Sequence, residues 1–178
     1  MQIAVLILFA TRELSLSAGA IGIAYALGGI GCVFASIFAQ RLSARYGVGP
    51  MLINGLILTA LGWQAFALIG GPPWIATLAL GAAMLVFDFG AIQWGINYLA
   101  LRQAITPDRL LGRMTATMRF FGVASAPLGS LVGGALATAV GLRATLLTVA
   151  VLGLLLSVAA VIWSPVRDHR RLPAHLPD

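Results

Sequence analysis

The sequence predicts an all-α integral membrane protein made of one short helix and five long transmembrane helices. Hydrophobic residues make up 60% of the 178 residues and charged residues only 9%, whereas soluble domains carry about 25% charged residues. The mean hydropathy is +0.99, so most of this chain is better solvated by lipid than by water. Five apolar stretches also reach the roughly 20 residues that a helix needs to cross a hydrocarbon core about 30 Å thick.

The first element, residues 1–11, is only half a span. It is apolar and ends in the polar group Thr11-Arg12-Glu13, as expected of a helix whose beginning is missing. A signal peptide is the alternative, but no Lys or Arg precedes the apolar run and no small-residue cleavage site follows it. We therefore expect Met1 to be an internal methionine or a boundary of the gene assignment.

Five full spans follow, separated by short polar or helix-breaking connectors that are too small to fold as a soluble domain. Together with the half-span they predict one transmembrane bundle over residues 1–163. Residues 164–178 hold three Arg and three Pro and are expected to form an unfolded cytoplasmic tail that touches anionic lipid. The predicted full spans are 17–40, 51–70, 74–101, 114–140 and 144–163.

The arginines predict the orientation, because cytoplasmic loops retain an excess of positive charge. If the half-span exits outward, five further crossings leave the C-terminus inside. The inner segments then hold eight arginines and the outer ends two. The sequence therefore predicts a multi-pass protein of a bacterial cytoplasmic membrane with its C-terminus in the cytoplasm. The inner arginines are Arg41, Arg45, Arg102, Arg109, Arg113, Arg167, Arg170 and Arg171, and the outer ones are Arg12 and Arg143.

The polar residues exclude several classes of function. The 11 basic residues are all Arg and are separated by long apolar runs, so they cannot form a face that binds nucleic acid. Cys32 lies alone in an apolar run, which excludes a disulfide or a CxxC site within the chain. His169 and His175 both fall in the tail. With no catalytic set and no phosphate-binding loop, we expect no enzyme, no metal site and no cofactor.

Small residues predict where the helices approach one another, because helices in lipid associate through close backbone contact. In the first full span a small residue recurs every four positions, in a series that includes Gly28 and Cys32, and Gly31, Ala35 and Ala39 lie alongside on the adjoining ridge. The fourth full span carries a similar series that includes Gly122 and the GxxxG pair Gly129 and Gly133. GxxxG alone is a weak signal, so packing is the plainer interpretation of this pair.

Two further residues of the fourth full span are candidates for functional roles, one in helix bending and one in charge pairing. Pro127 removes a backbone hydrogen bond and is expected to bend the helix, which would let it rock against a partner. Arg119 lies about two turns from the predicted inner boundary. It can extend its side chain to the lipid headgroups, or it can pair with an acid or an anionic solute.

Asp88 is the one acid deep in a span, midway along residues 74–101. A charged carboxylate at the bilayer centre costs about 2.5–3.5 kcal/mol on insertion scales, so it should face a cavity or a partner, or be protonated. Desolvation disfavours the charged form and would permit proton binding near neutral pH. Two interpretations stay open, a role in proton coupling or substrate binding and a hydrogen bond between helices.

Gln93 and Asn97 are the other polar candidates in this span. They lie four residues apart and share a face, whereas Asp88 lies roughly 180° from Asn97 around the helix at 100° per residue. The three side chains cannot all line one narrow path. We therefore expect one of the two stripes to be structural.

The connection after this span resembles a known family. Asn97–Gln103 reads Asn-Tyr-Leu-Ala-Leu-Arg-Gln, and Thr106–Arg113 reads Thr-Pro-Asp-Arg-Leu-Leu-Gly-Arg. The first three residues of the second run also predict a helix start, with the threonine as N-cap and the proline in the first position of a short interfacial helix. The two runs are similar to the link between helices ten and eleven in major facilitator superfamily transporters of the enterobactin-exporter and macrolide-efflux type. The loop residues concerned are Arg102, Pro107, Asp108, Gly112 and Arg113.

Two looser motifs agree with this resemblance. Arg41, Arg45 and Gly47 stand where the family carries a degenerate copy of its Asp-Arg-x-Gly-Arg signature between helices eight and nine, although the Asp is absent here. Its absence removes support for a charge relay in this loop. The glycine and proline series around Pro127 is similar to the antiporter motif of helix five.

The resemblance covers essentially the whole chain and implies a C-terminal six-helix bundle, helices seven to twelve, with the first helix truncated. It implies two such bundles that rock around a midplane site, with helices seven and ten lining the cavity, eight and eleven gating it, and nine and twelve facing lipid. The leading hypothesis is a proton-driven exporter of a small organic solute that works with a missing N-terminal six-helix half in the lipid bilayer. A non-transporting membrane scaffold or interaction subunit and an uptake transporter are the alternatives.

Overall fold

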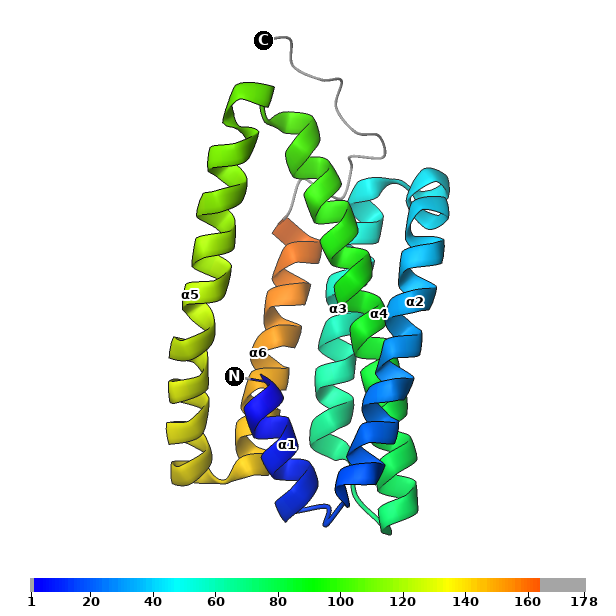
Figure 1. Ribbon diagram of the computed structural model, residues 1–178, viewed down its shortest axis with the longest axis vertical. Helices are drawn as coiled ribbons and strands as arrows, with labels where there is room; N and C mark the ends of the chain where they lie inside the picture. The colour runs from blue at the N-terminus through cyan, green and yellow to red at the C-terminus, as the bar shows by residue number, and fades with distance from the viewer. Residues whose placement is uncertain (1, 164–178) are drawn as a thin grey trace.

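The computed structural model describes residues 2–163, and Met1 and residues 164–178 lie outside the described part. The predicted tail, with three arginines and both histidines, is therefore outside it too. The described residues form six α-helices and no strand (Figure 1), and five of the helices are long and apolar enough to cross a membrane. The predicted all-α membrane fold is confirmed. The helices are α1 (Gln2–Arg12), α2 (Ala18–Tyr46), α3 (Val48–Leu68), α4 (Pro73–Ile105), α5 (Asp108–Val140) and α6 (Leu142–Trp163).

The connector expected over residues 41–50 is largely helical. α2 continues through Arg41 and Arg45, and α3 begins directly after Gly47. Gly47 alone separates the two helices, with a φ of 98° that favours glycine, and its N–H donates to the Ser43 carbonyl at 2.9 Å. The expectation of a loop was wrong here because hydropathy marks where the apolar run ends, whereas an arginine-containing segment can continue the same helix into the polar region.

The connection between α4 and α5 also differs from the prediction. No separate interfacial helix precedes the span, because α5 is continuous from Asp108. Thr106 is not the N-cap of this helix. Its hydroxyl donates to the Arg102 carbonyl at 2.8 Å and so closes the end of α4. Pro107 occupies the N-cap position instead, and no side chain caps the helix there.

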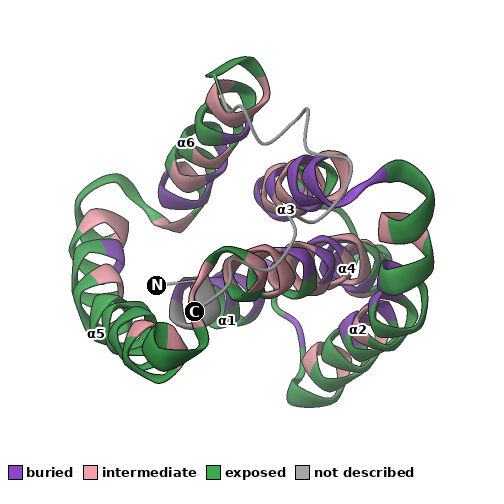
Figure 2. Ribbon diagram, turned by 90° about the horizontal axis from the view of Figure 1, so that it is seen from above, coloured by how far each residue is buried: buried purple, intermediate pink, exposed green. Residues whose placement is uncertain are grey.

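α4 lies between α2 and α3 and makes its main contacts with these two helices (Figure 2). Glycines permit the close approach. A Cβ on Gly31 of α2 would collide with the Leu85 carbonyl of α4, and a Cβ on Gly90 would lie 2.8 Å from the Gly55 carbonyl of α3. Small residues therefore bring the backbones of these helices together, as expected for helices in lipid.

The buried face of α2 combines the first residues of the predicted four-residue series with the predicted adjoining ridge. Gly28 lies on this face, whereas Cys32 is half-buried at its edge and Ser36 is exposed. A turn of 3.6 residues makes a strict repeat of four drift around the helix, which explains the difference. The buried residues of α2 are Ala24, Gly28, Gly31, Ala35 and Ala39.

The short helix α1 closes one end of the bundle. Phe9 is fully buried there and packs in a cluster with Phe66 of α3, Leu80 of α4 and Leu146 of α6. The cluster lies where α1 ends and α6 begins, at the lower end of Figure 1. The described chain therefore has its hydrophobic core at the end that the arginines predict to be outer.

α5 lies apart from the α2–α3–α4 group and contacts mainly α6 and α1 (Figure 2). Gly133 is the one buried residue along it among the residues described. Gly122 is exposed, and a Cβ placed on it would meet nothing within 4 Å. Pro127 is exposed and Gly129 is half-buried, and the helix continues through the proline. Within the described chain, the small-residue face of α5 therefore has no close helix partner except at Gly133.

Candidate functional site

Asp88 lies in the middle of α4 against Gly28 of α2. A Cβ on Gly28 would collide with the Asp88 Oδ2 atom, so the carboxylate occupies the space that the missing side chain leaves. Tyr25 and Cys32 lie one turn before and one turn after Gly28 on the same face of α2. Tyr25 is exposed, and Cys32 is half-buried at the edge of this face. The structure thus groups a carboxylate, a phenol and a thiol at the α2–α4 contact.

The Asp88 carboxylate has no hydrogen-bond donor and no cationic partner within residues 2–163. Its side chain is half-buried rather than enclosed. The hydrogen bond between helices that the sequence left open is therefore not formed in the described chain. A half-buried acid without a partner can bind a proton or a cationic group, because either one neutralises its charge in a medium of low dielectric constant.

Asn97 is tied to the helix packing. It is 2% exposed, and its Nδ2 donates to the Gln93 carbonyl of its own helix at 2.8 Å. The Ser43 hydroxyl of α2 lies 2.6 Å from Asn97 Oδ1, to which it donates, and 2.7 Å from the Ala39 carbonyl. Asn97 therefore joins α2 to α4 and has little hydrogen-bonding capacity left for a solute.

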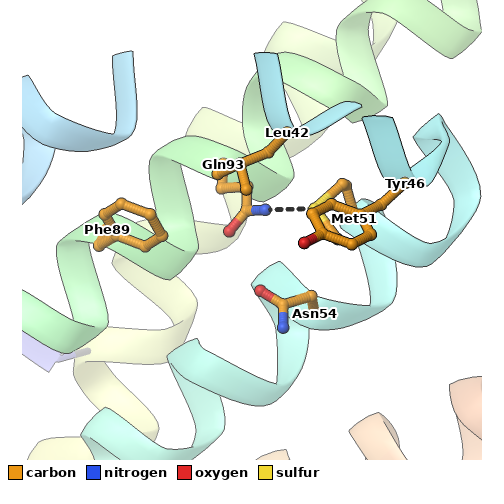
Figure 3. A pocket seen from close by; sticks show the side chains of 6 residues that line it. All are labelled: Leu42, Tyr46, Met51, Asn54, Phe89 and Gln93. Atoms are coloured by element: carbon orange, nitrogen blue, oxygen red, sulfur yellow. Dashed lines mark hydrogen bonds between the residues drawn. The ribbon is translucent and has the colours of Figure 1, made fainter. Parts of the chain in front are cut away.

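Gln93 faces a different space from Asp88. Its side chain is 1% exposed, its Nε2 donates to the Met51 Sδ of α3 at 3.0 Å, and its Oε1 is buried without a donor among the described residues. Gln93 lines an open cleft of about 400 Å³ between α2, α3 and α4 (Figure 3). The other lining residues are Leu42, Tyr46, Met51, Asn54 and Phe89.

The structure also locates the arginines and glycines of the predicted loop motifs. Arg41, Arg45, Arg109, Arg113 and Gly112 are exposed, and Asp108 is exposed at the start of α5. Arg119 is exposed on α5 and has no ion-pair partner within residues 2–163.

Arg102 differs from these exposed arginines. Its guanidinium lies 5.2 Å from the ring centroid of Tyr98, a cation–π contact. Its Nε and Nη2 atoms are buried and have no acceptor in the described chain.

Sequence reasoning missed the partners that α2 and α3 supply to α4. Tyr25 was not singled out, although its spacing of three residues from Gly28 places both on one face. Ser43 and Met51 were missed because their bonds to Asn97 and Gln93 join residues 54 and 42 positions apart. Such pairs depend on how two helices are aligned along their lengths, which a single sequence does not display.

The metal-binding potential of the described residues is low. No group of three or more His, Cys, Asp or Glu side chains within residues 2–163 could hold a metal ion. The site at Asp88 therefore consists of one titratable carboxylate with a phenol on the facing helix.

The family comparison covers nearly the whole chain. The model of the Major Facilitator Superfamily matches residues 1–175. The chain is 29% identical over 161 residues to the multidrug efflux pump Tap of Mycolicibacterium fortuitum. These aligned residues make up 90% of this chain and 37% of that protein. It is 26% identical over 144 residues to a multi-drug resistance efflux pump, the PmrA homolog of Lactococcus lactis, covering 81% of this chain and 33% of that protein.

A third relative is the multidrug resistance protein MdtH of Photorhabdus laumondii. It is 30% identical over 97 residues, which are 54% of this chain and 23% of that protein. The chain spans about a third of the length of the first two relatives. No solved structure matches it. The family match, the six helices and the five membrane-spanning candidates agree, and the chain belongs to the Major Facilitator Superfamily of membrane transporters.

Proposed function

We propose that this chain is the C-terminal half of a proton-coupled exporter of small organic solutes, in which Asp88 carries the coupling proton or contacts the solute. The observation that carries the proposal is the Asp88 carboxylate, which lies midway along a membrane-spanning helix, half-buried and without a partner within residues 2–163. The relatives named as efflux pumps support export over uptake.

The coupling follows from the cost of a charge inside the membrane. A carboxylate at this depth is favoured when it is protonated or paired with a cation and disfavoured when it is bare. If a proton and a solute compete for Asp88, arrival of one releases the other. Gly28 sets the position of the carboxylate, and the hydroxyl of Tyr25 can donate a hydrogen bond to a bound solute or to the carboxylate.

The whole exporter needs a second bundle. Alternating access requires two six-helix halves that rock about a midplane site, and we propose that the missing N-terminal half faces α1, α4 and the open side of α5. We propose that the protein lies in a bacterial cytoplasmic membrane with its C-terminus inside, and the arginine distribution supports this orientation. We propose no catalytic reaction and no cofactor, since a transporter of this kind works by binding and movement alone.

The test uses the complete transporter that contains this chain, reconstituted in proteoliposomes with ethidium as the transported probe. We expect Asp88→Asn to abolish uphill transport driven by a pH gradient, while exchange of dye in the absence of a gradient persists. Asp108→Asn is the matched control, because Asp108 is exposed at the start of α5 and should leave both activities unchanged. Unchanged transport with unchanged pH dependence in Asp88→Asn would remove this residue from the coupling mechanism.

A second measurement tests the need for the other half. Vesicles that contain only this polypeptide should show no proton flux on addition of ethidium. Dye-dependent proton flux in such vesicles would refute the proposal that transport needs two bundles.

A further inference from the structure

We propose that the cleft between α2, α3 and α4 is a second binding site, which takes an uncharged planar ring compound with a hydrogen-bond donor and acceptor side by side, as in a lactam. The cleft has a volume of about 400 Å³, and neither Asp88 nor Gly28 lines it. It is therefore separate from the proposed coupling site. Three features of the cleft carry the inference: a buried amide oxygen without a donor, a weak partner on the amide nitrogen, and uncharged walls.

The first feature is the amide oxygen of Gln93. This side chain is 1% exposed, and its Oε1 atom is buried and receives no hydrogen bond from the described residues. In Figure 3 the oxygen points away from Met51, on the side where Phe89 and Asn54 lie. A buried acceptor without a donor is rare, because it has lost its hydrogen bond to water without a replacement. A ligand N–H group that reaches this oxygen restores the missing bond.

The second feature is the partner of the amide nitrogen. Gln93 Nε2 donates to the Met51 Sδ atom at 3.0 Å, and a thioether sulfur is a weak acceptor. The Met51 side chain is unbranched and half-buried, so it can move aside when a ligand enters the cleft. Because the nitrogen and oxygen belong to one planar group, a ligand that displaces the sulfur meets a donor and an acceptor side by side.

The geometry of an amide restricts which ligands can use both atoms. A side-chain amide binds an adjacent donor and acceptor through two parallel hydrogen bonds, as Asn and Gln do with adenine in DNA. A lactam ring holds its N–H and C=O groups on the same side and can pair in this way. An ordinary secondary amide is trans and presents the two groups on opposite sides, so it can satisfy only one atom of Gln93.

The third feature is the absence of charge on the walls. No residue that lines the cleft carries a carboxylate, an ammonium or a guanidinium group, and Arg45 lies over the Tyr46 ring without lining the cleft. A charged ligand would lose its water here without gaining a counter-charge. Leu42 and Phe89 supply apolar surface that can pack against a flat ring. The volume also falls in the range of about 300–1,000 Å³ that is usual for small-molecule sites.

The experiment compares 2-quinolone with coumarin, two fused-ring compounds of the same shape. 2-Quinolone is a lactam, whereas coumarin has a ring oxygen in place of the N–H group. The dissociation constant of each tritiated compound is measured by scintillation proximity on the purified complete transporter that contains this chain. We expect coumarin to bind roughly tenfold more weakly, because it leaves the Gln93 oxygen without a donor. Equal affinities, or no specific binding of 2-quinolone, would overturn the proposal, and this comparison needs no variant.

Variants then assign the preference to Gln93. Gln93→Leu should give the two compounds nearly equal dissociation constants, because both amide groups are lost, and retained binding of coumarin would show that the cleft is still formed. Gln64→Leu is the matched control, since Gln64 is a half-buried amide of α3 that does not line the cleft. A preference for 2-quinolone that persists in Gln93→Leu, or that is also lost in Gln64→Leu, would contradict the assignment.

Asp88→Asn separates this cleft from the coupling site. We expect the dissociation constant of 2-quinolone to stay unchanged in this variant, because Asp88 does not line the cleft. This result would stand whether or not Asp88 proves to couple transport to protons. Weaker binding of 2-quinolone in Asp88→Asn would show that the compound binds at Asp88 and would overturn its assignment to the cleft.

Discussion

Gly90 provides the sharpest test of the helix packing, because its position fixes the distance between α3 and α4. A Cβ added at Gly90 would lie 2.7 Å from the Leu58 Cβ, 2.8 Å from the Gly55 carbonyl oxygen and 2.8 Å from the Thr59 nitrogen. Two of these three atoms belong to the backbone of α3, so the contact can relax only if the two helices move apart. Gly90→Ala should therefore destabilise the bundle.

The magnitude follows from two opposing effects. Alanine is favoured over glycine in a helix interior by about 1 kcal/mol, whereas forcing an extra methyl group into a packed interface costs typically about 1–3 kcal/mol. Gly95→Ala on the same helix is the matched control, because a Cβ there would meet nothing within 4 Å. The propensity gain is common to both variants, so we expect Gly90→Ala to be less stable than Gly95→Ala by the packing cost of about 1–3 kcal/mol.

The assay is unfolding of the purified chain in mixed micelles by titration with sodium dodecyl sulfate, followed by circular dichroism. The midpoint for Gly90→Ala should shift to a lower detergent fraction than the midpoint for wild type, whereas the midpoint for Gly95→Ala should not. Identical midpoints for the two variants would refute the reasoning that α3 and α4 touch at Gly90.

Two further predictions concern polar contacts. Ser43→Ala removes the hydroxyl that donates to Asn97 Oδ1, so the same titration should show a loss of about 1–2 kcal/mol; Ser36→Ala, whose exposed hydroxyl bonds only within α2, should lose much less. Glu13→Gln should change stability by less than about 1 kcal/mol, because its 3.4 Å ion pair with Arg143 is exposed. Arg143→Gln should cost more, since this guanidinium also donates to a backbone carbonyl at the end of α3 at 2.8 Å and lies over an aromatic ring of α1. Equal effects of the two substitutions would contradict this ranking.

The number and type of helices could be predicted from the sequence because each span must be long and apolar to cross lipid. The residues at which the helices begin and end could not be predicted in this way. The helical extension of α2 through Arg45 and the bond from Thr106 back to α4 depend on local backbone contacts that hydropathy does not record. The shortness of α1 was also predictable, because the apolar run that ends at Thr11 is too short to cross the membrane.

The candidate site was predictable only in part. Asp88 stood out because an acid is costly at the bilayer centre, and Gly28 stood out through its spacing with other small residues. That these two residues meet could not be predicted, because the contact depends on how α2 and α4 are aligned along their lengths. Gln93 lines the cleft and bonds to Met51 of α3, whereas Asn97 is bonded to Ser43 of α2 and joins two helices. These different roles could not be predicted either, because they depend on the partners that α3 and α2 supply.

The single-residue joint at Gly47 has a mechanical consequence. Only Gly47 lies between α2 and α3, and both helices are packed against α4, so movement of one helix relative to the other must be absorbed at Gly47 or at the contacts with α4. α2 continues without a break from Arg45 to Gly28, a distance of roughly 25 Å at 1.5 Å per residue. Gly47 and the contact between Gly28 and Asp88 therefore lie on one continuous helix, so the joint and the carboxylate are joined without an intervening loop.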